Sequence, residues 1–277
     1  QSVTNLTTFF GFIDDLIKNS TKKAGTIVHY KQTFRVLNEF SSHIKKDISF
    51  EDINLDFYEN FVNYLRDRGY AENTIGGYIK LIKVFMNEAI DRKITDNIEF
   101  KSRRFKRITE VSDKIYLNLD EVQKIYTQDL SKNMKLEKVR DLFVIGCFTG
   151  LRFSDLRQIT ANNFINNGTQ LKVKTEKTGE YVVIPLHKTV KEIVQKYNNE
   201  IPSVISNQKM NDYLKDIAKI AGLNDKISVS ITKGGEKQTE VFEKWQLVTV
   251  HTARRSFATN MYLLDIPTIS IMKITGH

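Results

Sequence analysis

Hydrophobic positions in the first hundred residues recur at steps of three and four, which is the spacing of a helical face. The helices predicted on this basis cover roughly 5–19, 24–43, 57–65 and 75–90. Asn73 or Thr74 stands where an N-cap of the last helix is expected, because short polar side chains accept bonds from the first backbone amides. We therefore predict a bundle of about four helices that ends near residue 95.

Beyond residue 114 the pattern mixes helical stretches with short alternating ones. An apolar run over 139–148 predicts a buried helix, which Gly150 is suited to end. Strands are predicted at 170–174, 181–186 and 227–231, with turns near Thr178–Gly179 and Gly234–Gly235. Further helices are predicted at 187–199, 207–221 and 252–263, and a short one after Pro267. The fold class is therefore mainly α with small β hairpins, an α+β chain.

A basic segment separates these two patterns. It runs from Lys101 to Arg107 and carries five basic side chains in seven residues. A solvated charge run is one interpretation, and a strap across a phosphate backbone is the other. We predict a helical domain over 1–100, a basic linker over 101–113 and a second domain over 114–277.

Composition narrows the classes of function. The chain has 42 Lys+Arg against 33 Asp+Glu, and this net charge of +9 favours a polyanionic partner, nucleic acid first. A single cysteine, Cys147, excludes an internal disulfide. No metal-ligand cluster is visible, and no apolar run approaches the roughly 20 residues that span a bilayer. We expect a soluble intracellular protein with no cofactor, no metal and no membrane partner.

Three segments of the second domain concentrate cationic and hydrogen-bonding side chains beside glycine: 149–155, 251–259 and 275–277. In the first, Arg152 lies between a helix-ending Gly150 and a predicted N-cap at Ser154, and Asp155 is placed to brace it. In the second, His251 and Arg254 share one face at a helix start, where a phosphate also meets backbone amides. Each segment alone is weak evidence, since surface arginines and histidines are common.

Together, the order and spacing of these segments closely resemble the tyrosine recombinase (phage integrase) family, in the style of integrases of Bacteroides-type mobile elements. The family's boxes read T-G-L-R with a following acid, H-x-x-R with a following F-A-T, and G-H, and this chain has them at 149–155, 251–259 and 276–277. The helical region ahead looks like the family's SAM-like core-binding domain. The resemblance covers roughly residues 5–277.

The resemblance implies a role for each matching residue. Arg152 and Arg254 match the arginines that clamp the scissile phosphate, and Asp155 matches the acid that supports the first. His251 matches a histidine that assists proton transfer, and His277 matches one that hydrogen-bonds a nonbridging oxygen. The implied reaction cleaves and rejoins DNA through a 3′-phosphotyrosine, without metal or ATP, to integrate or excise a mobile element such as a transposon.

Two of the family's positions are matched less directly. Lys177 aligns best with the family's hairpin lysine, with Lys174 as the competing candidate and Lys172 less favoured. The nucleophilic tyrosine follows the G-H box by about ten residues in the family, and none of the eleven tyrosines lies beyond His277. We therefore name no nucleophile, and we expect it in a tail that follows His277.

The resemblance also implies partners. Double-stranded DNA at attachment sites is the substrate, a homotetramer forms on DNA from a protein that is monomeric in solution, and a directionality factor is a candidate partner. Such a protein would work in the bacterial cytoplasm and associate with the nucleoid when bound. The residues expected to contact the DNA backbone are Lys80, Lys83, Arg103, Arg104, Lys106 and Arg107.

Three rival functions make different demands on these boxes. A DNA-binding accessory protein would have no need of a complete phosphate clamp. A metal-dependent nuclease requires clustered carboxylates, whereas these boxes are cationic. A type IB topoisomerase shares the chemistry, and it would relax supercoiled DNA that has no recombination site.

Overall fold

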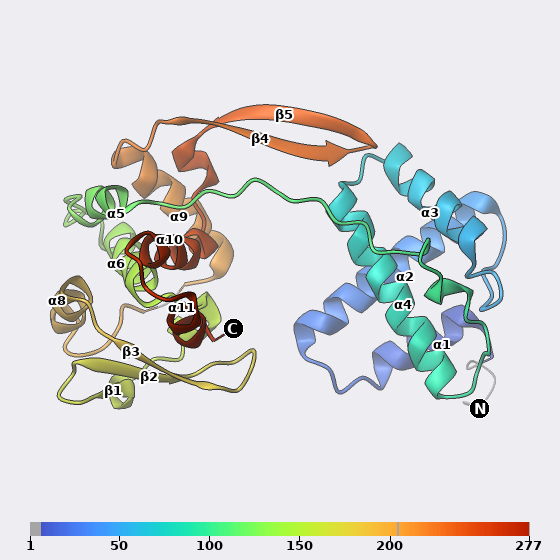
Figure 1. Cartoon of the computed structure of the whole chain (residues 1–277), viewed down its shortest axis with the longest axis horizontal. Helices are drawn as coiled ribbons and strands as arrows, with labels where there is room; N and C mark the ends of the chain where they lie inside the picture. The colour runs from blue at the N-terminus through green and yellow to red at the C-terminus, as the bar shows by residue number, and fades with distance from the viewer. Residues whose placement is uncertain (1–6, 204, 277) are drawn as a thin grey trace. The chain divides into compact units, whose positions relative to one another are not determined.

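The computed structural model describes residues 7–203 and 205–276, and these form two compact units (Figure 1). The first unit comprises residues up to Ser112 together with 230–240, and the second comprises 113–229 and 241–277. Helices dominate both units, and the strands form small antiparallel sheets, which confirms the predicted fold class. None of the described helices is both long and apolar enough to cross a membrane.

The first unit is a helical bundle with an aromatic core. Its helices are α1 (Phe9–Lys18), α2 (Ala24–Ile44), α3 (Leu55–Asp67) and α4 (Glu72–Asp91), followed by a 3-10 turn at Glu99–Lys101. Phe40, Phe61 and Phe85 are fully or almost fully buried, and the Phe40 and Phe61 ring centroids lie 5.1 Å apart in an edge-on pair. The apolar stripes predicted from spacing therefore face one common core.

The start of α4 differs from the prediction. The N-cap is Ala71, which makes no side-chain cap bond, and Asn73 lies inside the first turn. The Asn73 amide instead exchanges two hydrogen bonds with the backbone of Glu110, at 2.8 and 3.0 Å. An amide carries both a donor and an acceptor, so it satisfies a passing chain segment as well as it satisfies a helix end.

The basic segment is packed against this unit rather than extended away from it. Phe105 is fully buried in the core of the unit, and the Lys83 amine donates to its carbonyl oxygen at 2.8 Å. A Cβ on Gly76 of α4 would lie only 1.8 Å from the carbonyl oxygen of Ile108. The predicted linker over 101–113 therefore carries a buried phenylalanine that anchors it to α4, and its role as a linker stays a prediction.

The tip of a long hairpin also belongs to the first unit. The hairpin pairs β4 (Lys226–Lys233) with β5 (Glu236–Glu243), and its turn is the predicted pair of glycines. Thr232 donates from its backbone amide and its hydroxyl to the Glu110 carboxylate, at 2.9 and 2.6 Å. The Gly234 amide donates to the Tyr70 carbonyl. Polar bonds, rather than apolar burial, therefore hold the hairpin tip on this unit.

The second unit is built around α6 (Met134–Thr149), which contacts α5 (Leu119–Tyr126), α8 (Lys188–Lys196), α9 (Asn207–Ile220) and α10 (Val250–Leu263) (Figure 1). Its remaining helices are α7 (Phe153–Leu156), α11 (Thr268–Thr275) and two 3-10 turns, at Ala161–Asn163 and Lys244–Leu247. The predicted apolar run is buried on nearly every side, as expected for a central helix.

A three-stranded antiparallel sheet completes this unit, in the order β1 (Phe164–Ile165), β2 (Gln170–Lys174) and β3 (Tyr181–Pro185). Leu171 and Val173 of β2 pair with Ile184 and Val182 of β3, and all four side chains are buried. The alternation places the intervening lysines on the opposite, exposed face. The turn between β2 and β3 carries Lys177.

Candidate active site

The first box folds as a helix end followed at once by a helix start. Gly150 ends α6 in the left-handed conformation (φ 66°), as predicted. Arg152 is then the N-cap residue of the short helix α7, so the predicted cap at Ser154 is wrong and Ser154 lies inside the helix. The Arg152 carbonyl accepts from the amide of Asp155. A helix end and a helix start within a few residues thus fix where the Arg152 side chain leaves the backbone.

Asp155 links the first box to the β2–β3 turn. One of its carboxylate oxygens lies 3.9 Å from Nη1 of Arg152, and the other accepts a 2.8 Å hydrogen bond from the Glu176 amide. Among the described residues, Nη1 of Arg152 and Oδ2 of Asp155 are buried and have no hydrogen-bond partner. Asp155 therefore balances the charge of Arg152 without a close ion pair, which leaves a donor of that guanidinium for another acceptor.

Arg254 joins the three boxes. It lies on the buried side of α10, and its guanidinium donates to the carbonyl of Gly150 at 2.8 Å and to that of Thr275 at 2.6 Å. Arg152 donates a longer bond, 3.4 Å, to the carbonyl of Gly276. Segments far apart in the sequence therefore meet around two arginines that both donate to backbone carbonyl groups.

Small residues allow this convergence. A Cβ on Gly146 of α6 would lie 3.1 Å from Cβ of Ala253, and one on Gly150 would lie 2.4 Å from the Phe257 ring. The helices α6 and α10 thus approach closely at the end that carries the arginines. Gly276 has φ 65°, a left-handed conformation that favours glycine, and a Cβ there would be in ordinary contact with Nη1 of Arg152 at 3.8 Å.

The electrostatics of this cluster favour an anion. Burial, followed by the nearby charge of Arg152, lowers the pKa of Arg254 to about 10, and Asp155 opposes the shift. Burial and then Arg255, Arg254, Lys114 and Arg152 lower the pKa of His251. Burial also lowers the pKa of Arg255. Positive charge is therefore held here at a cost that a bound anion would relieve.

The three candidate lysines lie on one hairpin but in different settings. Lys172 and Lys174 extend from β2, and their amines lie 5.2 and 5.7 Å from the centroid of the Tyr181 ring. Lys177 lies exposed in the turn next to Glu176, whose amide is bonded to Asp155. The turn that carries Lys177 is thus bonded to Asp155 of the arginine cluster, by which we mean Arg152, Arg254 and Asp155. The other two amines instead lie over the Tyr181 ring. The assignment of Lys177 as the hairpin lysine stays a prediction.

The residues predicted to bind the DNA backbone all lie in the first unit, in varied settings. Lys80 and Arg107 line a hollow between α2 and α4 that polar side chains surround, including His29 and Gln32. Lys83 is half-buried against the Phe105 ring and carbonyl. Arg104 pairs with Glu59 at 2.9 Å, and Arg103 and Lys106 are exposed. Their contacts to DNA stay predictions.

Sequence reasoning missed the anchoring of α10. The Ser256 hydroxyl accepts from the backbone amide of the fully buried Leu117, at 2.8 Å, and the Asn260 amide donates to the Leu117 carbonyl, at 2.9 Å. These bonds hold the helix that bears His251 and Arg254. The hydroxyl residue after Arg254 was a visible signal, but its partner is 139 residues away.

The predicted His277 lies outside the described residues, and no cluster of potential metal ligands occurs among those described.

Comparison with known proteins agrees with this arrangement. Residues 8–108 match the phage integrase SAM-like domain, and residues 115–277 match the phage integrase family. Tyrosine recombinase XerD of Listeria monocytogenes is 23% identical over 271 residues, covering 96% of this chain and 88% of that protein. Tyrosine recombinase XerA of Pyrococcus horikoshii is 24% identical over 265 residues, covering 82% of this chain and 87% of that protein.

Solved structures share the fold. A lambda integrase tetramer bound to a Holliday junction superposes with a TM-score of 0.70 at 20% identity, covering 100% of this chain and 78% of that one. A Tn1549 transposon integrase bound to a circular intermediate DNA gives a TM-score of 0.70 at 14% identity, covering 98% and 91%. The chain therefore belongs to the phage integrase family, the tyrosine recombinases, which are site-specific enzymes that cleave and rejoin DNA.

Proposed function

We propose that this chain integrates or excises a mobile element by site-specific strand exchange, with Arg152 and Arg254 as the clamp on the scissile phosphate. The observation that carries the proposal is the convergence of the two arginines on the carbonyls of Gly150, Thr275 and Gly276. A phosphodiester under attack gathers charge on its nonbridging oxygens, and preorganised guanidinium groups stabilise that charge without reorganising.

The remaining roles follow from proton and charge placement. A tyrosine supplied from beyond the G-H box attacks phosphorus, its oxygen forms a new bond, and the bond from phosphorus to the 5′ oxygen breaks. Lys177 gives the proton that makes the departing group a 5′ hydroxyl. The lowered pKa of His251 keeps its imidazole neutral near pH 7, so it is suited to accept the tyrosine's proton. His277 is assigned to a nonbridging oxygen, as the family resemblance implies.

The proposed partner is double-stranded DNA at attachment sites, bound by a tetramer that assembles from monomers in the bacterial cytoplasm. The structures with a similar fold include lambda integrase as a tetramer on a Holliday junction and as a dimer on a core site. The net charge of +9 supports binding dominated by phosphate contacts, which salt should weaken steeply. A directionality factor is a further candidate partner, and a Bacteroides-type element is the proposed source.

A suicide substrate tests the proposal. The full-length protein is incubated without metal on an attachment-site duplex that carries a nick beside the cleavage site, so that the cleaved flank diffuses away and the covalent complex accumulates. We expect an adduct on a denaturing gel, with the modified tyrosine located by mass spectrometry and no adduct from Arg152→Ala. A protein that binds the site tightly but forms no adduct would be a DNA-binding accessory protein instead.

A further inference from the structure

The turn that carries Lys177 is held by a pair of threonine hydroxyls. Thr175 precedes the turn and is only 2% exposed, and its Oγ1 lies 2.7 Å from Oγ1 of Thr178. The Thr175 hydroxyl also lies 3.2 Å from the Glu180 carbonyl. One arrangement satisfies both contacts, in which Thr178 donates to Thr175 and Thr175 donates to Glu180. The hydroxyl pair therefore ties together the residues on the two sides of Lys177.

The backbone closes the same turn. The amide of Thr175 donates to the Glu180 carbonyl at 2.9 Å, and the amide of Gly179 donates to the Thr175 carbonyl at 2.9 Å. Gly179 has φ 75°, a left-handed conformation that glycine adopts without strain. Four hydrogen bonds of Thr175 thus converge on one short turn, which fixes the Cα of Lys177 while its side chain stays exposed.

The turn is also fixed to the arginine cluster on two sides. The Glu176 amide donates to Asp155 at 2.8 Å, and the Gln158 amide donates to the Glu176 carboxylate at 3.0 Å. On the other side, a Cβ on Gly276 would lie 3.3 Å from the methyl carbon of Thr175. Thr175 therefore turns its hydroxyl toward Thr178 and its methyl toward Gly276, whose carbonyl accepts from Arg152.

We propose that Thr175 and Thr178 are positioning residues for the proton donor of strand cleavage, an inference that rests on the proposed function of Lys177. A general acid acts only within hydrogen-bond reach of the atom that it protonates. A lysine amine sits on a flexible four-carbon stem, so its position depends on how firmly the backbone beneath it is held. The hydroxyl pair holds that backbone in register with the arginines.

The test compares two leaving groups in single-turnover cleavage by the full-length protein. One substrate has the natural 5′ oxygen at the scissile phosphate, and the other has sulfur in its place. A thiol is a much stronger acid than an alcohol, so the sulfur leaves without being protonated. Loss of the proton donor slows the first substrate only, whereas loss of a phosphate clamp slows both.

We expect Thr175→Val to slow cleavage of the oxygen substrate by about 10- to 100-fold, a part of the 10²- to 10⁴-fold that general acids contribute. We expect a rate near that of the unaltered protein on the sulfur substrate. Thr178→Val should show the same pattern of rates. Because Thr178 is exposed, this variant replaces Thr175→Val in the test if Thr175→Val folds poorly. Thr169→Val is the matched control, because its hydroxyl bonds a carbonyl in the β1–β2 turn, away from Lys177.

Lys177→Ala and Arg254→Ala separate this inference from the proposed function. The sulfur substrate should restore the cleavage rate of Lys177→Ala, and it should not restore that of Arg254→Ala. Two results would refute the positioning role, given that sulfur restores the cleavage rate of Lys177→Ala. In the first, both threonine variants cleave both substrates slowly. In the second, both threonine variants cleave both substrates at the rate of the unaltered protein. If Lys177→Ala is not restored by sulfur, Lys177 is not the proton donor, and the inference falls together with that assignment.

Discussion

Two buried arginines of the second unit, Arg140 and Arg254, are each 7% exposed and have opposite surroundings. Arg140 lies near the start of α6, within a network of carboxylates and phenols. Arg254 lies on α10 against the end of α6, where its guanidinium donates to the carbonyls of Gly150 and Thr275. Arg140 is thus paired with carboxylates, whereas Arg254 donates to two backbone carbonyl groups.

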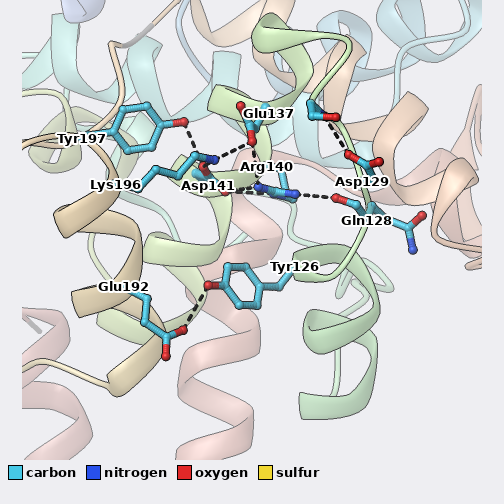
Figure 2. A network of polar contacts seen from close by, with 10 residues as sticks. Tyr126, Gln128, Asp129, Glu137, Arg140, Asp141, Glu192, Lys196 and Tyr197 are labelled. Carbon is cyan, nitrogen blue, oxygen red and sulfur yellow. Dashed lines mark hydrogen bonds and ion pairs between the residues drawn. The ribbon is translucent and has the colours of Figure 1, made fainter.

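The network around Arg140 is closed, in the sense that each of its two acids contacts both of its cations (Figure 2). Its guanidinium bonds Asp141 at 2.8 Å and lies 3.7 Å from Glu137, and both acids also bind Lys196, at 2.8 and 2.6 Å. Tyr197 donates to Asp141 at 2.9 Å, and burial together with that carboxylate raises the pKa of Tyr197. Two cations and two acids therefore neutralise one another around the buried Arg140 and Asp141, with Glu137 and Lys196 partly exposed.

The arginine cluster carries more positive than negative charge, with Arg152 and Arg254 beside the single acid Asp155. The pKa of Arg254 falls to about 10, first through burial and then through Arg152, so the folded chain holds this cation at a cost. Among the described residues, Nη1 of Arg152 has no hydrogen-bond acceptor. The comparison teaches that burial alone does not distinguish a functional arginine. Excess charge beside an unused donor supports the proposed role, because an incoming phosphate would satisfy both.

The largest expected change in stability comes from breaking the matched network. Arg140→Met should lower the free energy of unfolding by about 3–5 kcal/mol, because Asp141 is left buried with one cation fewer. Arg104→Met is the control, since its ion pair with Glu59 is exposed on both sides and should change stability by less than about 1 kcal/mol. Urea unfolding measures both. An Arg140→Met protein as stable as the control would show that the network is not closed.

Removing one neutral donor from the same network should lower the free energy of unfolding by less than removing Arg140 does. Tyr197→Phe deletes a hydrogen bond to a buried carboxylate, and we expect a loss of about 1.5–3 kcal/mol. Tyr126→Phe is the matched variant, because its phenol donates to the more exposed Glu192. Urea titrations of the two variants should rank Tyr197→Phe as the more destabilised, and the opposite order would mean that Asp141 does not depend on this bond.

The smallest effect concerns the protonation of His251. Burial and then four cations lower its pKa below the ordinary 6.5, so the folded chain binds this proton less tightly than the unfolded chain does. Its contribution to stability is therefore present above pH 6.5 and is lost as the pH falls below it. A bound duplex should raise this pKa, because a phosphate offsets the cations.

Histidine NMR across a pH titration, with the signal assigned through His251→Gln, measures this change. We expect the midpoint of the His251 signal to lie at higher pH in the presence of an attachment-site duplex than in its absence. A midpoint that the duplex leaves in place would mean that no phosphate approaches His251.

The sequence predicted those features that depend on local spacing. The apolar stripes predicted the helices of the first unit, and the left-handed end of α6 at Gly150 follows from glycine alone. Two local predictions, the caps at Asn73 and Ser154, were wrong because other parts of the chain decide them. Asn73 bonds the distant Glu110, and Arg152 takes the cap position of α7.

The site was predicted as a set of residues and not as an arrangement. The boxes identified Arg152, Asp155 and Arg254, and the structure brings these three together. The carbonyls that orient the arginines and the link from Asp155 to the Glu176 amide exist only in three dimensions. The Arg140 network was not foreseen, since an adjacent Arg–Asp pair is common in surface helices and its burial depends on α8.

The contrast between the two arginines is tested most directly by measuring cleavage and stability together for Arg254→Met and Arg140→Met. Single-turnover cleavage of a nicked attachment-site duplex is followed at a temperature where both proteins are folded, as urea unfolding establishes. We predict that Arg254→Met slows cleavage by about 10²- to 10³-fold and loses less stability than Arg140→Met does, because burial of the Arg254 cation is itself costly. We predict that Arg140→Met loses stability and keeps its cleavage rate. If both variants instead lose cleavage in proportion to their loss of stability, the two arginines do the same structural work and the account is contradicted.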